Sequence, residues 1–326
     1  MPLVYRSALV AMLLSSVSLQ AAELLNASYD VTREFYKDFN PAFVQYWKDK
    51  TGETVTINQS HGGSTKQARS VVDGLPADVI TMNRSADIDI LAQKGKLIPA
   101  NWQTRLLNNS VPSASPTVFL VRKGNPKQVK DWDDLVRPGV TSVIPNPKTS
   151  GNGKYSYLAA WGYVTQKGGD AAKARQFVTE LFKHVPVLDT GGRGATTTFA
   201  QREIGDVLVT FENEVYLLQK ELGEDKYEVV YPSVTVLAEN PVSLVDKVVD
   251  KKGTRKVAQA YLEFHFSPQG QALAAKHYLR PQVSEVAQPS FKKLHTFTVK
   301  QAFGSWTEAE NTHFSDGGIF DQIYQK

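Results

Sequence analysis

Short apolar runs alternate with segments of helical periodicity along most of this chain. Val55 to Asn58 and Ala77 to Met82 have the length and composition typical of strands. Between them, Ala68, Val71 and Val72 recur at the spacing of one helical face. The same change of period repeats toward the C-terminus. Such strand–helix units favour an α/β fold with mainly parallel sheets flanked by helices.

The first 22 residues have the pattern of a secretory signal rather than of a folded domain. Arg6 gives a positive start, residues 8–19 are mostly apolar, and Ala21 and Ala22 offer small side chains for cleavage. This apolar run is too short to cross a bilayer, which takes about 20 apolar residues, and no later stretch approaches that length. We therefore expect residues 1–22 to be removed and the mature protein to be soluble and exported.

The length of the mature chain predicts two lobes, because roughly 300 residues exceed what one hydrophobic core usually serves. We expect residues 23–112 and 242–326 to form the first lobe and residues 113–241 the second. The chain would cross between them near Val111 to Pro116 and Leu237 to Pro241. Ligands of open α/β sheets bind at the carboxyl ends of strands, so we expect a binding cleft between the lobes.

Composition excludes several classes of function. The chain has no cysteine, which excludes disulfides, thiolate metal sites and a lipid-modified N-terminal cysteine; together with the signal this predicts a bacterial periplasmic protein. The formal charge of +4 is spread without a basic stripe, so we expect no nucleic-acid partner. The 6 histidines lack the spacing of metal ligands, and we expect neither a metal site nor a cofactor.

Three stretches combine glycine with hydroxyl residues where a strand is expected to give way to a helix. They are His61 to Lys66, Lys148 to Asn152 and Gly191 to Thr196. Glycine lets consecutive N–H groups point one way, and the following helix adds unpaired N–H donors and a partial positive charge. One such turn is a weak signal. Three of them together predict helix ends that converge on one small, multiply charged oxyanion.

Uncharged donors would favour a fully ionised dianion of the sulfate type. Monohydrogen phosphate would bring a proton into a site without an acceptor, at a cost of about 1–3 kcal/mol. Each hydroxyl taken alone could instead be a helix N-cap. The expected donors are the hydroxyls of Ser64, Thr149 and Ser150 and the backbone N–H groups of Gly63, Gly151, Asn152 and Gly192.

Two charged residues complicate this prediction. If the carboxylate of Asp30 faced the anion, it could accept a phosphate proton; we expect it instead to cap the helix that follows and to turn its backbone N–H to the ligand. Arg193 could meet the anion directly or lie behind it. We expect it to lie behind and to hold carbonyls and acids in place.

With these residues assembled, the chain resembles the sulfate and thiosulfate-binding proteins of bacterial ATP-driven importers. The likeness runs from about Glu23 to the C-terminus. It rests on Leu-Leu-Asn-Ala-Ser-Tyr-Asp at 24–30, Gln-Ser-His-Gly-Gly-Ser at 59–64, Phe-Leu-Val-Arg-Lys-Gly-Asn-Pro-Lys at 119–127, Pro-Asn-Pro-Lys-Thr-Ser-Gly-Asn at 145–152, Tyr-Leu-Ala-Ala-Trp-Gly at 157–162 and Asp-Thr-Gly-Gly-Arg-Gly-Ala-Thr-Thr-Thr-Phe at 189–199.

The resemblance implies a two-lobed, type II-like periplasmic binding protein with a closing cleft. It further implies a monomeric solute-binding component, not an enzyme, which delivers sulfate or thiosulfate to the membrane permease subunits of an ABC importer. The ligand-binding residues that it implies are Asp30 and Ser64 from the first lobe and Ser150, Gly151, Asn152, Gly192 and Phe211 from the second, with Gly63, Thr149 and Arg193 supporting them.

Two positions depart from the sulfate-only pattern of that family. Asn152 stands where the pattern has a second glycine, and Phe211 stands where it has a tryptophan whose indole N–H donates to the anion. Phenylalanine offers an apolar wall and no donor. A terminal sulfur is larger and a weaker acceptor than oxygen, so the resemblance points to thiosulfate as ligand, with sulfate as the second.

Two other readings stay open at this point. The first is a binding protein for another oxyanion such as phosphate, molybdate or tungstate. The second is a secreted hydrolase of sulfate or phosphate esters. The hydrolase has little support, because Gly62-Gly63-Ser64-Thr65-Lys66 has lysine where the nucleophile-elbow motif has its last glycine.

Overall fold

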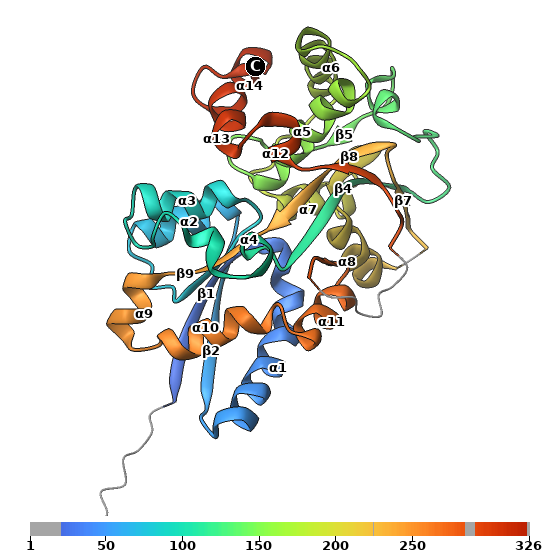
Figure 1. Ribbon diagram of the computed structural model, residues 1–326. Helices are drawn as coiled ribbons and strands as arrows, with labels where there is room; N and C mark the ends of the chain where they lie inside the picture. The colour runs from blue at the N-terminus through green and yellow to red at the C-terminus, as the bar shows by residue number, and fades with distance from the viewer. Residues whose placement is uncertain (1–20, 224, 284–290, 325–326) are drawn as a thin grey trace, which may run out of the picture.

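The computed structural model describes residues 21–223, 225–283 and 291–324, and they form two α/β lobes joined side by side (Figure 1). The expected signal segment lies outside the described residues except for Ala21 and Ala22. Ala22 is the first residue of strand β1 and is paired with Val55. Among the helices of the described residues, none combines the length and the apolarity that crossing a membrane would take.

The first lobe contains a four-stranded sheet with the strand order β2-β1-β3-β9. Strand β1 runs parallel to β2 and β3, and β9 is antiparallel to β3. The strands are β1 (Ala22–Tyr29), β2 (Val55–Gly62), β3 (Val79–Thr81) and β9 (Val242–Leu244). The helical segments are η1 (Asp30–Thr32), α1 (Arg33–Thr51), α2 (Ser64–Val72), α3 (Ser85–Gln93), η2 (Trp102–Arg105), α4 (Leu107–Ser110), α9 (Asp246–Lys252), α10 (Arg255–Phe264) and α11 (Pro268–Lys276).

The second lobe contains a seven-stranded sheet built around β4, with the main order β11-β8-β4-β6-β5. Strands β7 and β10 also pair with β4. The strands are β4 (Ser113–Arg122), β5 (Ser142–Val143), β6 (Val207–Phe211), β7 (Tyr227–Val230), β8 (Val234–Asn240), β10 (Arg280–Pro281) and β11 (His295–Phe297). The helical segments are η3 (Trp132–Val136), α5 (Gly151–Gln166), α6 (Ala171–Lys183), α7 (Gly192–Ala200), α8 (Glu212–Leu222), α12 (Val299–Phe303), α13 (Trp306–Ala309), η4 (Glu310–Phe314) and α14 (Ile319–Ile323).

The second sheet differs from the mainly parallel arrangement that we expected in both lobes. Strand β4 is antiparallel to β6, β7, β8 and β10, whereas β5 with β6 and β11 with β8 are parallel. The reason is topological. Strand β4 carries the chain away from the junction of the lobes, while β6 and β8 run back toward that junction.

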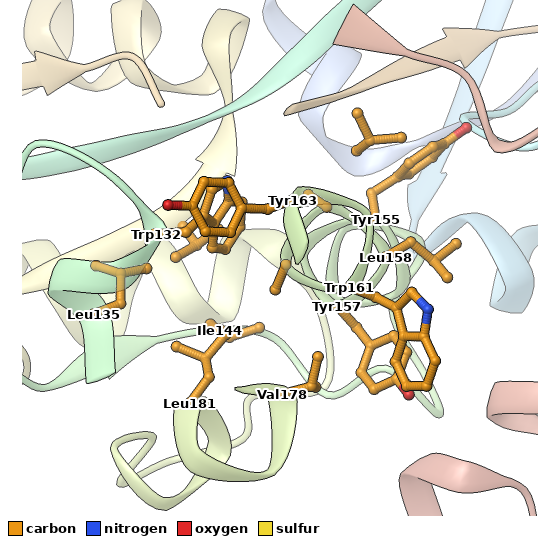
Figure 2. Packing of buried hydrophobic residues seen from close by; sticks show 14 of the residues in the cluster. Trp132, Leu135, Ile144, Tyr155, Tyr157, Leu158, Trp161, Tyr163, Val178 and Leu181 are labelled. Carbon is orange, nitrogen blue, oxygen red and sulfur yellow. The ribbon is translucent and has the colours of Figure 1, made fainter. Parts of the chain in front are cut away.

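Helix α5 forms the centre of the largest hydrophobic core. Almost every residue from Gly151 to Tyr163 is buried, and the cluster around α5 includes Trp132, Leu135, Ile144 and Leu181 (Figure 2). A second cluster on the other face of this sheet contains α7 and α8 residues such as Phe199 and Leu218. Helices therefore cover both faces of the second sheet, and the start of α5 is held in a rigid setting.

The lobes are joined where we expected the chain to cross. The beginning of β4 pairs with the end of β8, in the register Ser113 with Asn240 and Pro116 with Leu237. Immediately before β4, Asn108, Asn109 and Ser110 all have positive φ, of 48°, 54° and 63°. These left-handed residues turn the chain sharply between the first lobe and β4.

The C-terminal segment belongs to the second lobe, which differs from the expected division of the chain. We expected residues 242–326 to lie together in the first lobe. However, β11 pairs in parallel with β8, and Phe297, Trp306, Phe314 and Phe320 lie in the same core as α5. Figure 1 shows α12, α13 and α14 beside α5 and α6. The chain thus crosses a third time between the lobes, because these aromatic side chains complete the cover of α5.

Replacing Phe297 tests this placement of the C-terminal segment. Its ring is buried against Gly162 of α5 so closely that a Cβ at Gly162 would collide with it. Phe297→Ala should lower the free energy of unfolding by about 3–5 kcal/mol, because it leaves a cavity in a packed core. Urea unfolding measures the change. His295→Ala is the control, since His295 is exposed on the same strand; equal effects of the two substitutions would contradict the placement.

Candidate functional site

The three glycine–hydroxyl stretches become the starts of three helices at the junction of the lobes. Helix α2 begins at Ser64 in the first lobe, while α5 begins at Gly151 and α7 at Gly192 in the second. The first N–H groups of a helix have no partner within it. Each start therefore presents backbone donors and the positive end of a helix dipole.

Close contacts show that these starts meet at one place. A Cβ on Gly63 would lie 3.8 Å from the carbonyl oxygen of Thr149, across the two lobes. A Cβ on Gly151 would lie 2.9 Å from Nδ2 of Asn83, which follows β3 of the first lobe. The contact at Gly151 leaves no space for a side chain, whereas a Cβ on Gly63 would make an ordinary van der Waals contact. The two lobes therefore touch at these turns, and we call this contact the closed arrangement.

The hydroxyl of Ser64 does not serve as the donor that we expected. It donates to Oδ2 of the buried Asp87 at 2.6 Å, so its proton is already engaged. The hydroxyl of Thr149 is engaged in the same way and donates to the carbonyl of Thr190 at 2.9 Å. What Ser64 can offer to a ligand is its backbone N–H at the start of α2.

Ser150 keeps a hydroxyl proton available. It is the N-cap of α5, and its Oγ accepts a hydrogen bond from the N–H of Gly153 at 3.2 Å. A hydroxyl can donate while it accepts, and no bond donated by this hydroxyl is present within the described residues. Among the three expected hydroxyl donors, Ser150 is thus the one that remains free for an anion.

The side chain of Asn152 connects the second-lobe loops instead of pointing to a ligand. Its Nδ2 donates to Oγ1 of Thr210 on β6 at 2.9 Å, and its Oδ1 accepts from Ser156 at 3.3 Å. The same Nδ2 would lie 3.0 Å from a Cβ on Gly192. Asn152 therefore fixes the start of α5 against α7 and β6, and its amide group keeps a second N–H that the bond to Thr210 does not use.

Phe211 forms an apolar boundary at the carboxyl end of β6. It is buried, and its ring lies edge-to-face with that of Tyr155, with the ring centres 5.7 Å apart. It is also the N-cap residue of α8. A phenyl ring in this position supplies shape without a hydrogen-bond donor.

Asp30 lies between the lobes but does not cap the helix that follows it. It is the first residue of η1, whose N-cap position is Tyr29, and no side-chain hydrogen bond caps this helix within the described residues. The expected cap is therefore wrong. The Asp30 carboxyl lies at the start of α7, with Oδ2 3.7 Å from a Cβ on Gly191. Burial raises the pKa of Asp30, and the backbone N–H groups of Asp30 and Arg193 oppose that rise.

The Arg193 guanidinium is paired with carboxylates on α8. It lies 3.6 Å from Oε1 of Glu214 and 3.1 Å from Oε2 of Glu221. Glu214 is fully buried and accepts from Oγ1 of Thr196 at 2.8 Å. Burial raises the pKa of Glu214 to about 7. These contacts show that Arg193 holds acids of α8, while its position relative to an anion stays a prediction.

Sequence reasoning missed a group of polar residues next to this site. Asn83 and Arg84 lie between β3 and α3, and Asp87 is in the first turn of α3. All three are buried, and Asp87 holds both Ser64 and Thr65. The signal that could have found them is their place in the sequence, because they follow a buried strand at the same end of the sheet as the glycine turns.

His61 also has a structural partner. Its Nδ1 lies 2.6 Å from Oγ of Ser28 in the neighbouring strand, and burial lowers the pKa of His61 to about 4. The imidazole is therefore neutral at pH 7. A search of the described residues for clusters of histidine, aspartate and glutamate that could hold a metal ion finds none.

Replacing Glu214 should change how stability depends on pH. A carboxyl whose pKa is raised by folding stabilises the fold while protonated, and this contribution is lost as the pH rises through about 7. Relative to the wild type, unliganded Glu214→Gln should gain about 3 kcal/mol in unfolding free energy between about pH 4.5 and 7.5. Urea unfolding across this range measures the change. Glu221→Gln, on the exposed partner of Arg193, is the control; parallel profiles for wild type and Glu214→Gln would contradict the raised pKa.

Known proteins share both the sequence and the fold. The chain is 61% identical to the thiosulfate-binding protein of Pseudomonas aeruginosa, over 93% of this chain and 92% of the relative. It is 53% identical to the sulfate-binding protein of Escherichia coli, over 96% of each chain. The solved sulfate-binding protein SubI from Mycobacterium tuberculosis aligns with a TM-score of 0.79 at 28% identity, covering 90% of this chain and 100% of the other.

A family model places the chain among binding proteins. Residues 24–280 match the model described as "Bacterial extracellular solute-binding protein", which covers most of the chain and strands of both sheets, but not β11. The alternative of an ester hydrolase has no counterpart among the relatives named above, all of which are named as binding proteins. This chain therefore belongs to the bacterial extracellular solute-binding proteins and is not an enzyme.

Proposed function

We propose that this chain is the periplasmic solute-binding component of an ATP-driven sulfate/thiosulfate importer. It acts as a monomer and hands the anion to the permease subunits of the ABC importer. The names of its relatives support the ligand class, because they include thiosulfate-binding and sulfate-binding proteins. The structural observation that carries the proposal is the meeting of the α2, α5 and α7 starts from both lobes at one place.

The anion is held by neutral donors. We place it against backbone N–H groups of the three helix starts and the hydroxyl of Ser150, with Phe211 as its apolar boundary. The nearby cation Arg193 is paired with Glu214 and Glu221, so it supports the loop instead of neutralising the ligand. The proposed ligand-binding residues are Asp30, Ser64, Ser150, Gly151, Asn152, Gly192 and Phe211, supported by Gly63, Thr149 and Arg193.

Several such hydrogen bonds are enough for tight binding. A hydrogen bond to a charged group contributes about 1.5–3 kcal/mol net. Five to seven of them, less the costs of association and closure, reach micromolar affinity, or about −8 kcal/mol. Because donors come from both lobes, the anion favours the closed arrangement over an open one. A permease can recognise the loaded protein by this difference in shape.

Thiosulfate is the expected preference over sulfate. The ring of Phe211 cannot donate, so one direction around the ligand is apolar. A terminal sulfur accepts hydrogen bonds weakly and loses little there, whereas a sulfate oxygen would lose a donor. Isothermal calorimetry with both anions tests the ranking. We expect thiosulfate to bind at least as tightly as sulfate; thiosulfate binding tenfold weaker would overturn the preference, and binding of neither anion would overturn the function.

Phosphate is the second candidate ligand, because the carboxyl of Asp30 lies at the start of α7. If it faced the anion it could accept the proton of monohydrogen phosphate. Competition by phosphate between about pH 6 and 8 separates the two ligands, since the proton count of phosphate changes in this range. We expect no displacement of thiosulfate at millimolar phosphate; displacement that strengthens as the pH falls would favour phosphate.

Removing the Ser150 hydroxyl should weaken anion binding. Ser150→Ala deletes one hydrogen bond to a charged ligand, and the dissociation constant should rise by about tenfold to a hundredfold. Calorimetry measures this change. Ser267→Ala is a matched control, because Ser267 caps α11 with the same bond to the third helical residue, from Gly270 at 3.0 Å. Equal affinities of Ser150→Ala and the control would exclude Ser150 as a donor.

Restoring an indole at position 211 should shift the preference toward sulfate. Phe211→Trp adds an N–H donor where a sulfate oxygen can accept it, so the ratio of sulfate to thiosulfate affinity should rise by about tenfold. Phe211→Leu is the control that keeps the wall apolar and adds no donor. A ratio that is unchanged by tryptophan would show that residue 211 does not face the anion.

A further inference from the structure

A chain of paired side chains connects the two lobes next to the proposed anion site. It runs from Ser64 through Asp87 and Arg84 of the first lobe to Glu310 and Lys154 of the second. The four charged members sum to zero charge. The chain ends at the two helices, α2 and α5, whose starts face each other across the site.

The first-lobe half of this cluster fixes the start of α2. Arg84 donates through Nε to Oδ2 of Asp87 at 3.0 Å, and through Nη2 to Oγ1 of Thr65 at 2.8 Å. Asp87 in turn accepts from Ser64 at 2.6 Å and from Thr65 at 3.0 Å. Arg84 and Asp87 are almost completely buried. The first two residues of α2 are thus held by one buried ion pair.

The second-lobe half comes from the C-terminal segment. Glu310 accepts from Nη1 of Arg84 at 3.0 Å through Oε2, and its other oxygen is paired with the buried Lys154 of α5. Lys154 lies one turn after the start of α5. Trp306 of α13 also lies under Arg84, with the guanidinium 5.0 Å from the ring. Glu310 and Trp306 therefore attach the first lobe to the second.

We propose that Arg84 and Glu310 are positioning residues that clasp the closed lobes and set the distance between the starts of α2 and α5. The inference rests on the proposed anion-binding function, and it adds residues that do not touch the anion. The Arg84–Glu310 bond crosses the lobes, so it exists in the closed arrangement and is lost on opening. The anion and the Arg84–Glu310 bond both favour the closed arrangement. Anion binding therefore stabilises this bond, and the bond raises the affinity for the anion.

The burial of the cluster explains why the clasp should matter. An exposed ion pair contributes little, but Arg84 is only 3% exposed and is stacked on Trp306. When Glu310 loses its charge, two buried cations, Arg84 and Lys154, lose their shared acceptor. The closed state carries that cost, whereas an opened state lets water reach both groups.

Glu310→Gln is the test, because Glu310 is 34% exposed and an amide of the same shape should fold. Asp321→Asn is the matched control. Asp321 is an acid of the same C-terminal segment with 36% exposure, and its partner Lys148 lies in the same lobe, at 2.9 Å. Since the chain has no cysteine, Lys48→Cys on α1 and Lys173→Cys on α6 supply a unique pair of spin labels, one on each lobe.

Two readouts are needed: the thiosulfate dissociation constant by calorimetry, and the label-to-label distance by electron spin resonance with and without thiosulfate. We expect Glu310→Gln to weaken binding at least about fivefold, the lower end of ordinary coupling between sites, and to populate longer distances at subsaturating thiosulfate. Asp321→Asn should match the wild type in both. A purely structural role would lower the melting temperature without moving the distances in the folded protein.

The outcomes separate this inference from the proposed function. Wild-type protein that binds thiosulfate while Glu310→Gln keeps the same affinity and distances overturns the clasp alone. Wild-type protein that binds neither thiosulfate nor sulfate overturns the proposed function. In that case the label-to-label distances in the unliganded proteins test the clasp. Equal distance distributions for wild type and Glu310→Gln would overturn it.

Discussion

The site depends on backbone N–H groups that a helix cannot satisfy by itself. Every helix leaves its first N–H groups unpaired, and burial of such groups is costly unless a partner is found. Here the starts of α2, α5 and α7 lie at the junction of the two lobes. In the proposed function, a small anion with acceptors on all sides satisfies them together, so that fold and ligand would be matched through the same donors.

The charged side chains around the site form ion pairs with one another within the protein. Arg193 is paired with Glu214 and Glu221, and Arg84 is paired with Asp87 and Glu310. Ions that neutralise each other cannot attract a solute strongly, but they fix the loops that carry the neutral donors. In the proposed site, selectivity would follow from hydrogen-bond geometry and from the number of protons on the ligand, because the charge of the ligand would be met by dipoles that do not move.

Much of the arrangement could be predicted from local sequence. The helix starts at Ser64, Gly151 and Gly192 were expected, because glycine and hydroxyl residues mark turns that precede helices. The crossing of the chain near Ser113 and Asn240 was expected as well. The direction of β4 was not, since antiparallel and parallel strands have the same apolar pattern when both faces of the sheet are covered.

The sequence by itself determined the α/β class, the three anion-type turns and the family likeness, because each depends on residues that are close together in the sequence. Tertiary structure alone decided which donors are free. The hydroxyl of Ser64 donates its hydrogen bond to Asp87, and one side-chain N–H of Asn152 donates to Thr210. It also decided that the C-terminal segment covers α5 and carries Glu310 to Arg84. These pairings join residues far apart in the chain, and only packing selects among the partners that local chemistry allows.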